Sequence, residues 1–411
     1  MSNVTSSATI LVMPKIRPRF FPILVVGLFG LTIFPDYAFS NENQVRVATF
    51  NTSLFGKKTG ELKQELGSGQ SRQARNVAAI IQRVRPDILL LNEFDFERDQ
   101  QNVRLFERLY LGHSQEDGQP IKYPYTFVAP VNTGIASGFD LDGDQKKDGA
   151  GDAFGYGNFP GQYGMAVLSR FPINRQMTRT FQKFLWKDMP KALTPTNKDN
   201  TGFYSQEAWK QFRLSSKSHW DVVIELRQQQ LHFLVSHPTP PVFDKEDDHN
   251  GRRNHDEIRF WKDYIQPQTS VYIYDDRGGV GGLKKNSLFI IAGDQNADPA
   301  DGDSTGSPIR MLLQHASIQA EPAPGSAGAV EASRFGKANL KHRGKPKLDT
   351  AQFGPETVGN LRLDYVLPSK NLRLVDSGVF WPLKNEPEAR FIQASDHRLV
   401  WIDIQLPSMK R

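Results

Sequence analysis

The feature that most constrains the fold of this chain is a pair of apolar segments, each of which leads into a polar residue. Residues 45–50 alternate between apolar and polar types and precede Asn51, and residues 88–91 form an apolar run that leads into Glu93. Ser71, between them, is typical of a helix N-cap, and the apolar residues after it recur at the spacing of one helix face: Val77, Ile80, Ile81 and Val84. The pattern predicts a strand–helix–strand unit. Because such crossovers are right-handed and join parallel strands, Asn51 and Glu93 should lie at one rim of a sheet.

Further apolar segments repeat this arrangement along the chain. We predict strands at 165–169, 222–226, 231–236, 288–292, 361–367 and 399–404, and several of them border His237, Asp294, Asp364 or His397. Long polar stretches at 96–162, 178–218, 240–285 and 297–358 separate the strands and contain many of the 33 glycines and 26 prolines. Loops of this length are typically functional or irregular insertions in a scaffold. Strands that alternate with helices predict an α/β architecture.

The polar residues beside the predicted strands suit a hard metal cation. The set comprises Asn51, Glu93, His237, Asp294, Asn296, Asp364, Asp396 and His397, and the chain has no cysteine. Thiolate zinc sites, iron–sulfur clusters, disulfides and cysteine nucleophiles are therefore excluded. Carboxylates and amides are the ligands that Mg²⁺ or Mn²⁺ prefers, and imidazoles nearby can donate to a phosphoryl group. The set therefore predicts hydrolysis of a phosphate ester by water.

Seven short blocks that contain these residues resemble the ordered signature blocks of the endonuclease/exonuclease/phosphatase superfamily. The blocks are Phe50-Asn51-Thr52, residues 86–93, Ala166–Pro172, Ser236-His237-Pro238, Ala292–Asn296, Arg362–Val366 and Ser395–Arg398. They span nearly all of the chain after residue 45. The resemblance implies a four-layer sandwich of two mixed β-sheets flanked by helices, with long loop insertions and the site at one rim.

The resemblance also implies a role for each residue. Glu93 would be the main metal ligand, with Asn51 beside it on metal or phosphate, and Asp396 would bind the metal directly or through water. The other five would be catalytic. Asp294 would position or deprotonate the attacking water, Asn296 would bind phosphate, and His237 would donate to a phosphate oxygen. His397 would contact the scissile phosphate, and Asp364 would hold His397 in one tautomer.

Residues 1–40 resemble an export signal. Lys15, Arg17 and Arg19 precede an apolar run at 20–34, and Ala38 and Ser40 fit the small-x-small pattern before a cut at Asn41. Met1 and Met13 both remain candidate starts. The segment holds three basic residues and one acidic residue, so it contributes two of the six positive net charges. We therefore expect a periplasmic or secreted protein, soluble and without stable membrane insertion, in which 41–411 form one catalytic domain.

Four other patterns are left open by the sequence. The acidic segment from Asp140 to Asp152 is either a solvated loop or a structural calcium loop that departs from the EF-hand pattern. Tyr163 is a loose match to a phosphate contact. The arginines of Arg252-Arg253-Asn254, before a helix predicted at 256–265, either bind phosphate or start that helix. The basic run at 341–347 either follows a polyanion or is simply solvated.

These observations predict an exported, divalent-metal-dependent phosphoester hydrolase of nuclease, phosphodiesterase or phosphatase type. A lipid phosphodiesterase of sphingomyelinase type is one alternative, and a non-catalytic protein that binds a phosphate ligand on the same fold is another. Nucleic acid is one candidate substrate among several. The sequence leaves the substrate, the number of metal ions and the oligomeric state open.

Overall fold

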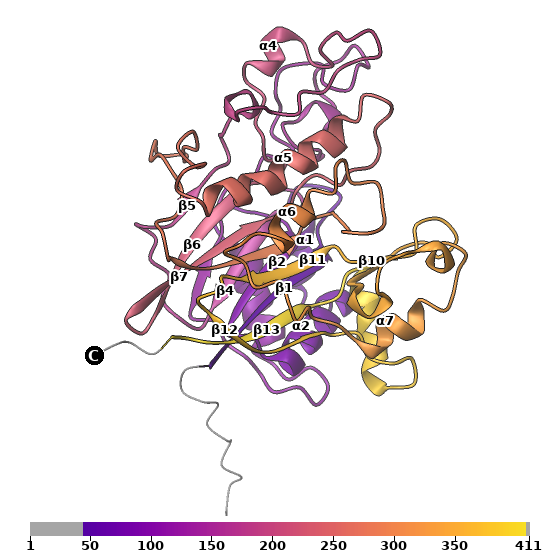
Figure 1. Cartoon of the computed structure of the whole chain (residues 1–411). Helices are drawn as coiled ribbons and strands as arrows, with labels where there is room; N and C mark the ends of the chain where they lie inside the picture. Colours follow the sequence, from indigo (N-terminus) through magenta and orange to yellow (C-terminus); the bar gives the residue numbers. More distant parts are fainter. Residues whose placement is uncertain (1–43, 408–411) are drawn as a thin grey trace, which may run out of the picture. The chain divides into compact units, whose positions relative to one another are not determined.

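Two mixed β-sheets form the centre of the protein. We describe it from a computed structural model, in which residues 44–407 are described (Figure 1). The six-stranded sheet has the order β12-β13-β1-β2-β4-β3. Its strands are β1 (Gln44–Leu54), β2 (Ile88–Phe94), β3 (Tyr125–Phe127), β4 (Met165–Ser169), β12 (Arg373–Val379) and β13 (Val400–Gln405). The β1–β2 pair is parallel and the other pairs are antiparallel.

The second sheet has five strands in the order β11-β8-β7-β6-β5. They are β5 (Arg179–Thr180), β6 (His219–Leu226), β7 (Gln229–Ser236), β8 (Leu288–Asp294) and β11 (Asp364–Pro368). Only the β7–β8 pair is parallel among these strands. A separate two-stranded ladder joins β9 (Ala351–Gln352) to β10 (Asn360–Leu361). Both large sheets are therefore mixed, as predicted.

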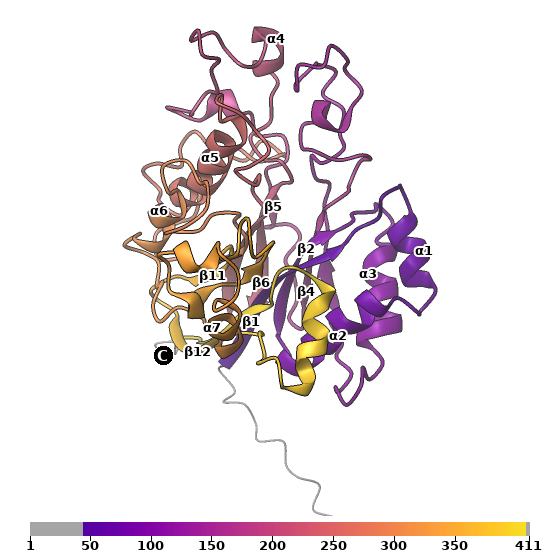
Figure 2. The same ribbon diagram turned by 90° about the vertical axis from the view of Figure 1, so that its right-hand side faces the viewer.

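Helices cover the outer face of each sheet. The α-helices are α1 (Glu61–Gly67), α2 (Arg72–Val84), α3 (Gln101–Phe106), α4 (Gln206–Trp209), α5 (His249–Tyr264), α6 (Ile309–Leu313) and α7 (Ala327–Ala332). Figure 2 shows α1, α2 and α3 on one side of the sheets, with α5 and α6 on the other. The short 3-10 or π helices are η1 (Glu107–Leu111), η2 (Ala150–Asp152), η3 (Trp186–Asp188), η4 (Asn339–Lys341), η5 (Pro346–Leu348) and η6 (Pro387–Ala394).

Three apolar layers hold this arrangement together. One lies between the sheets, where Val47 and Leu90 of the first sheet pack in the same cluster as Phe233 of the second. The alternate residues of the same strands point outward, so Ala48 and Leu89 pack with the inner face of α2. On the far side, α5 and α6 cover the other face of the second sheet. The predicted four-layer sandwich is confirmed.

The strand–helix–strand unit has the predicted form. The Ser71 side chain accepts a hydrogen bond from the Ala74 N–H at 3.2 Å and caps α2, and Arg85 ends the helix in a left-handed conformation. The parallel register pairs Asn51 with Asn92, so Asn51 and Glu93 do lie at one rim.

Two boundaries were predicted wrongly. The segment 361–367 is not one strand, because Leu361 belongs to β10 and β11 begins only at Asp364. The helix predicted at 256–265 begins seven residues earlier, at His249, so Arg252 and Arg253 lie inside α5 rather than before it.

The described residues all fall within one compact unit. Within residues 44–407, no helix combines the length and the apolar character that a bilayer crossing requires. The predicted export signal lies outside the described residues, and the domain boundary at 41 stays a prediction.

Candidate active site

The predicted site residues meet where strands of both sheets end at one rim. Asn51 and Glu93 lie at the carboxyl ends of β1 and β2 in the first sheet. In the second sheet, His237 follows β7, and Asp294 ends β8 opposite Asp364, the first residue of the antiparallel β11. Sheet topology thus places residues from distant parts of the sequence side by side.

Asp294 is the centre of this group. One of its carboxylate oxygens, Oδ2, accepts a hydrogen bond from Asn51 Nδ2 at 3.1 Å and lies 3.4 Å from His237 Nε2. The same oxygen is 3.6 Å from His397 Nε2. Asn51, His237, Asp294 and His397 are all buried. Two imidazoles and an amide therefore surround one carboxylate oxygen at the interface between the sheets.

His397 is held on its other side by Asp364. The distance between His397 Nδ1 and Asp364 Oδ2 is 2.8 Å, and the Thr350 hydroxyl donates to the same oxygen at 2.8 Å. Although burial alone would lower it, the carboxylates of Asp364 and Asp294 raise the pKa of His397 to about 10. Both ring nitrogens then carry protons, one toward Asp364 and one toward Asp294. The predicted contact between Asp364 and His397 is therefore present, and with both nitrogens protonated it fixes the orientation of the ring rather than its tautomer.

Burial shifts the pKa of the other two central groups in opposite directions. It raises the pKa of Asp294 to about 7, against the opposing effect of His397. It lowers the pKa of His237 well below the usual value, and the nearby Lys217 and His397 act in the same direction. The site therefore contains one cationic and one neutral imidazole at neutral pH. A cationic donor beside a carboxyl group with a pKa near neutrality is suited to general acid–base catalysis on an anionic substrate.

The remaining predicted residues lie around this centre. Asn296 is half-buried, and its Nδ2 donates to the Pro238 carbonyl at 3.1 Å, which joins it to the His237 segment. Asp396 is exposed, and its Oδ1 lies 3.4 Å from the hydroxyl of Ser53, near the end of β1. Burial raises the pKa of Glu93, and the charge of Asp396 adds to the effect. The structure thus brings Asn51, Glu93 and Asp396 to the same side of the site.

One group at the site has ligand atoms close enough together to hold a metal ion. The ligand atoms of Asp294, Asp364 and His397 all lie within 4.8 Å of one another. A protonated imidazole has no free lone pair, however, and His397 is already bonded to one of these carboxylates and faces the other. Asn51, Glu93 and Asp396 offer an amide oxygen and two carboxylates, which is the oxygen donor set of a hard cation. We therefore favour this second set for the metal.

Two buried polar residues at the site were not predicted from the sequence. Lys217 precedes β6 and is buried, which lowers its pKa, while the charges of Glu257, Glu93 and Asp294 oppose that shift. Asn92 joins the sheets, because its Oδ1 accepts from the Asp294 N–H at 3.2 Å and its Nδ2 lies 3.4 Å from the Ser236 carbonyl. An asparagine inside an apolar strand was a usable signal, whereas Lys217 lies in a stretch that was read only as an irregular loop.

The sequence pattern of the Endonuclease/Exonuclease/phosphatase family matches residues 48–397, which include all of the residues above. The chain belongs to this family. Comparison with curated protein sequences gave no match.

Among solved structures, this family member is similar to an endonuclease/exonuclease/phosphatase from Beutenbergia cavernae, with 18% identity, a TM-score of 0.48 and coverage of 89% of this chain and 72% of that chain. It is also similar to sphingomyelinase C from Streptomyces griseocarneus, with 14% identity, a TM-score of 0.45 and coverage of 88% and 99%. A third similar structure is truncated TDP2 from Caenorhabditis elegans, with 14% identity, a TM-score of 0.42 and coverage of 88% of this chain and 97% of that chain. These values select no substrate class.

The open patterns of the sequence have mixed outcomes. Arg253 is buried and donates to the carbonyls of Leu214 and Phe154 at 2.8 Å and 2.5 Å, so its guanidinium holds loops rather than phosphate. In the basic run, the Arg343 N–H donates to Asp301 at 2.9 Å. The ligand atoms of Asp140, Asp142 and Asp144 lie within 4.8 Å of one another. A calcium ion there stays a prediction.

Tyr163 lies near Glu93, one of the predicted metal ligands. Burial raises the pKa of its hydroxyl, and the charge of Glu93 adds to the effect. A phosphate contact through this hydroxyl also stays a prediction.

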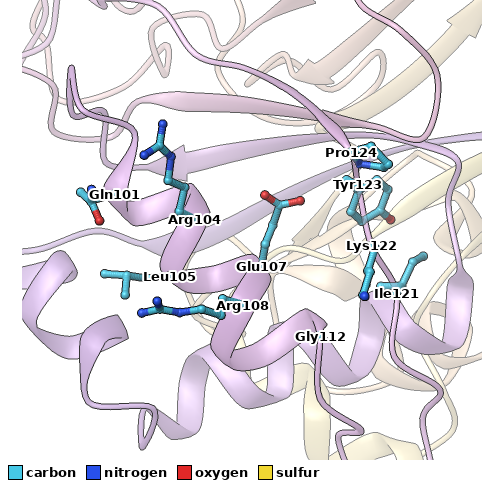
Figure 3. A pocket seen from close by; sticks show the side chains of 10 residues that line it. All are labelled: Gln101, Arg104, Leu105, Glu107, Arg108, Gly112, Ile121, Lys122, Tyr123 and Pro124. Atoms are coloured by element: carbon cyan, nitrogen blue, oxygen red, sulfur yellow. The ribbon is translucent and has the colours of Figure 1, made fainter.

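One sizeable cavity lies away from the active site. It has a volume of about 820 Å³ and is formed by α3, η1 and residues 121–124 (Figure 3). None of the predicted site residues lines it. Burial raises the pKa of Glu107 in its wall to about 7, and a hydrogen bond from the Tyr123 backbone opposes this.

Proposed function

We propose that this protein is an exported, divalent-metal-dependent phosphodiesterase of the endonuclease/exonuclease/phosphatase family. The observation that carries the proposal is the buried contact of a cationic His397 with Asp364, beside Asp294 and His237. A protein that only binds phosphate has no need of a cationic donor and a carboxylate base side by side. Phosphoester hydrolysis needs both, because negative charge increases on the phosphoryl group and its leaving oxygen while water loses a proton.

The residues of the chain divide these tasks. His397 donates through Nε2 to a phosphoryl oxygen, and Asp364 keeps the ring in the orientation that makes this possible. Asp294 orients the attacking water and receives its proton, which its pKa of about 7 permits near neutral pH. His237 and Asn296 contribute further donors to the phosphate, and Asn51 fixes the carboxylate of Asp294. The water attacks phosphorus in line with the leaving group, without a covalent enzyme intermediate.

Magnesium or manganese is the cofactor in this proposal. Glu93, Asn51 and Asp396 would hold the ion. When bound, it supplies positive charge to the phosphoryl oxygens and to the leaving oxygen. Glu93 is half-buried and Asp396 is exposed, and their carboxylates fit this role as hard oxygen ligands.

Two alternatives stand beside this proposal. A lipid phosphodiesterase of sphingomyelinase type would use the same residues on a substrate in a membrane surface. A non-catalytic phosphate-binding protein would keep the fold and lose turnover. Export rests on the sequence pattern of residues 1–40 alone.

The test is a substrate panel with and without EDTA. The panel comprises supercoiled plasmid, RNA, sphingomyelin vesicles, bis(p-nitrophenyl) phosphate and p-nitrophenyl phosphate. We expect turnover of at least one diester that EDTA abolishes and Mg²⁺ or Mn²⁺ restores. Asp294→Asn should lower kcat by about 10³-fold or more while the far-UV circular dichroism stays unchanged. Turnover that EDTA leaves intact, or an active Asp294→Asn variant, would refute the proposal.

A further inference from the structure

Helix α5 has a polar stripe on its buried face that reaches the active-site rim. Asn254, Glu257 and Trp261 are spaced by three and four residues, so they lie on one side of the helix, and all three are buried. Asn254 Nδ2 donates to the carbonyls of Thr239 and Gln295 at 2.8 Å and 3.0 Å. Trp261 Nε1 donates to the Ser236 hydroxyl at 2.9 Å. The helix thus binds the segments on both sides of His237 and the one after Asp294.

Glu257 occupies the middle of this stripe and joins two separate segments. Its Oε1 accepts the Ser216 N–H at 2.6 Å, and its Oε2 accepts the Thr239 N–H at 2.6 Å. Ser216 precedes the buried Lys217, and Thr239 follows His237 by two residues. The Glu257 carboxylate also interacts electrostatically with Lys217. One side chain therefore bonds to the backbone shortly before β6 begins and shortly after β7 ends.

We propose that Glu257 is a positioning residue of the active site, which fixes the two segments that bring Lys217 and His237 to Asp294. The inference rests on the proposed phosphodiesterase function and extends it to a residue that touches no substrate. Lys217 then lies within electrostatic reach of both Glu93 and Asp294.

A carboxylate is the side chain that this position requires. Both groups that face Glu257 are backbone donors, and a carboxylate offers an acceptor to each. The amide of a glutamine offers one acceptor and presents an N–H₂ group to the other donor. Glu257→Gln should therefore displace either the Lys217 segment or the His237 segment while most apolar packing is kept.

Asp256 provides a matched control on the same helix. It is as deeply buried as Glu257. Its Oδ2 accepts hydrogen bonds from Trp186 Nε1 and the Leu193 N–H, both at 2.7 Å, and its Oδ1 lies 3.0 Å from His255 Nδ1. Trp186 and Leu193 belong to the loop around η3, and His255 is the neighbouring residue on α5. Asp256→Asn thus removes a buried charge without disturbing the backbone contacts at Ser216 and Thr239.

The experiment compares wild type, Glu257→Gln and Asp256→Asn with Mg²⁺ and bis(p-nitrophenyl) phosphate, and records the histidine ring signals of each by ¹⁵N NMR. We expect the Tm to fall for both variants. Only Glu257→Gln should lower kcat, by about 10–100-fold, which is the usual effect of an outer supporting contact. Only that variant should move the His237 ring signals. If Glu257→Gln does not fold, Glu257→Asp, which keeps the charge but retracts it by one methylene, replaces it.

Equal kcat values for the two variants, with unmoved His237 signals, would overturn the inference. If the wild type itself has no metal-dependent turnover, the proposed function fails instead. The NMR comparison then still decides whether Glu257 positions His237.

Discussion

Asp364→Asn separates the charge of Asp364 from the geometry that it maintains. The His397 ring and the Thr350 hydroxyl both bond to Oδ2, and among the described residues Oδ1 has no hydrogen-bond partner. The Thr350 oxygen already accepts the N–H groups of Leu363 and Asp364 at 2.9 Å, so its proton must point to Oδ2. An asparagine with its oxygen in the place of Oδ2 keeps both bonds. The substitution therefore removes a negative charge, at the cost of a buried N–H₂ group in the place of Oδ1, which has no partner there.

The pKa of His397 sets the size of the expected effect. Burial lowers this pKa, and Asp364 is the strongest of the groups that raise it to about 10. Without that charge, the pKa should fall toward the ordinary value of about 6.5, a difference of roughly 5 kcal/mol at 1.36 kcal/mol per pH unit. Because neighbouring groups relax, we expect a measured fall of at least about two pH units.

The sign of the stability effect follows from the same pKa. A histidine whose pKa is raised on folding stabilises the folded state fully below about pH 6.5, and this contribution is lost as the pH rises through about 10. Asp364→Asn should therefore be less stable than wild type at pH 6, and the difference should shrink toward pH 10. Urea unfolding at both pH values measures it.

The assay follows the His397 ring protons by NMR titration in EDTA, and then kcat at pH 7.5 with Mg²⁺. A neutral His397 is a weaker donor, so kcat should fall by about 10²–10³-fold. Thr350→Ser keeps the hydroxyl and serves as the control. A His397 pKa that stays near 10 in Asp364→Asn, together with wild-type kcat, would refute the electrostatic argument.

Two further predictions concern buried charges. Burial, with the charges of Asp298 and Asp301, raises the pKa of Asp349 to about 8. Its ionisation therefore lowers the stability of the folded protein as the pH rises from about 4 through 8. Asp349→Asn should stabilise the protein by roughly 1–3 kcal/mol at pH 9 and hardly at pH 4. Thermal unfolding at both pH values measures the difference. Lys217→Met keeps an apolar stem of similar length without the buried ammonium. It should lower kcat/KM by about 10–100-fold in the diesterase assay, while the Tm stays the same or rises. A fall in Tm without loss of activity would show that Lys217 serves the fold alone.

Much of the fold could be predicted because its signals are local. The N-cap at Ser71 and the apolar spacing through Val84 identify α2 without any tertiary information. The handedness of the crossover then places Asn51 beside β2. The site residues could be located for the same reason, since each borders an apolar strand and strand ends gather at a rim.

Other features depend on contacts between distant segments. Residues 361–367 alternate like a strand, but the Arg362 N–H donates to the Asp298 side chain at 2.8 Å and the Leu363 carbonyl accepts from the Gln295 N–H at 2.8 Å. These contacts replace ladder bonds and break the strand before Asp364. The role of Glu257 likewise depends on two loops that approach α5 only in the folded chain.

The backbone at the rim shows most clearly what local patterns cannot reveal. Ser53, Tyr163 and Asn296 have φ values of 50°, 54° and 51°, in the left-handed region that residues other than glycine rarely adopt. Each of their N–H groups is held by the side chain of another residue at the rim: Asn51 at 3.3 Å, Asp95 at 3.0 Å and Asp294 at 2.8 Å, respectively.

Asn51 and Asp294 therefore each have two functions. One atom of the side chain holds the turn that follows its strand, while Asn51 Nδ2 and Asp294 Oδ2 meet each other in the site. Such turns cost on the order of 1 kcal/mol each and persist only where surrounding contacts fix them. A substitution at either residue consequently changes the shape of the rim as well as its chemistry. For this reason Asp294→Asn, which keeps an acceptor for the Asn296 N–H, is a cleaner test of the chemistry than Asp294→Ala.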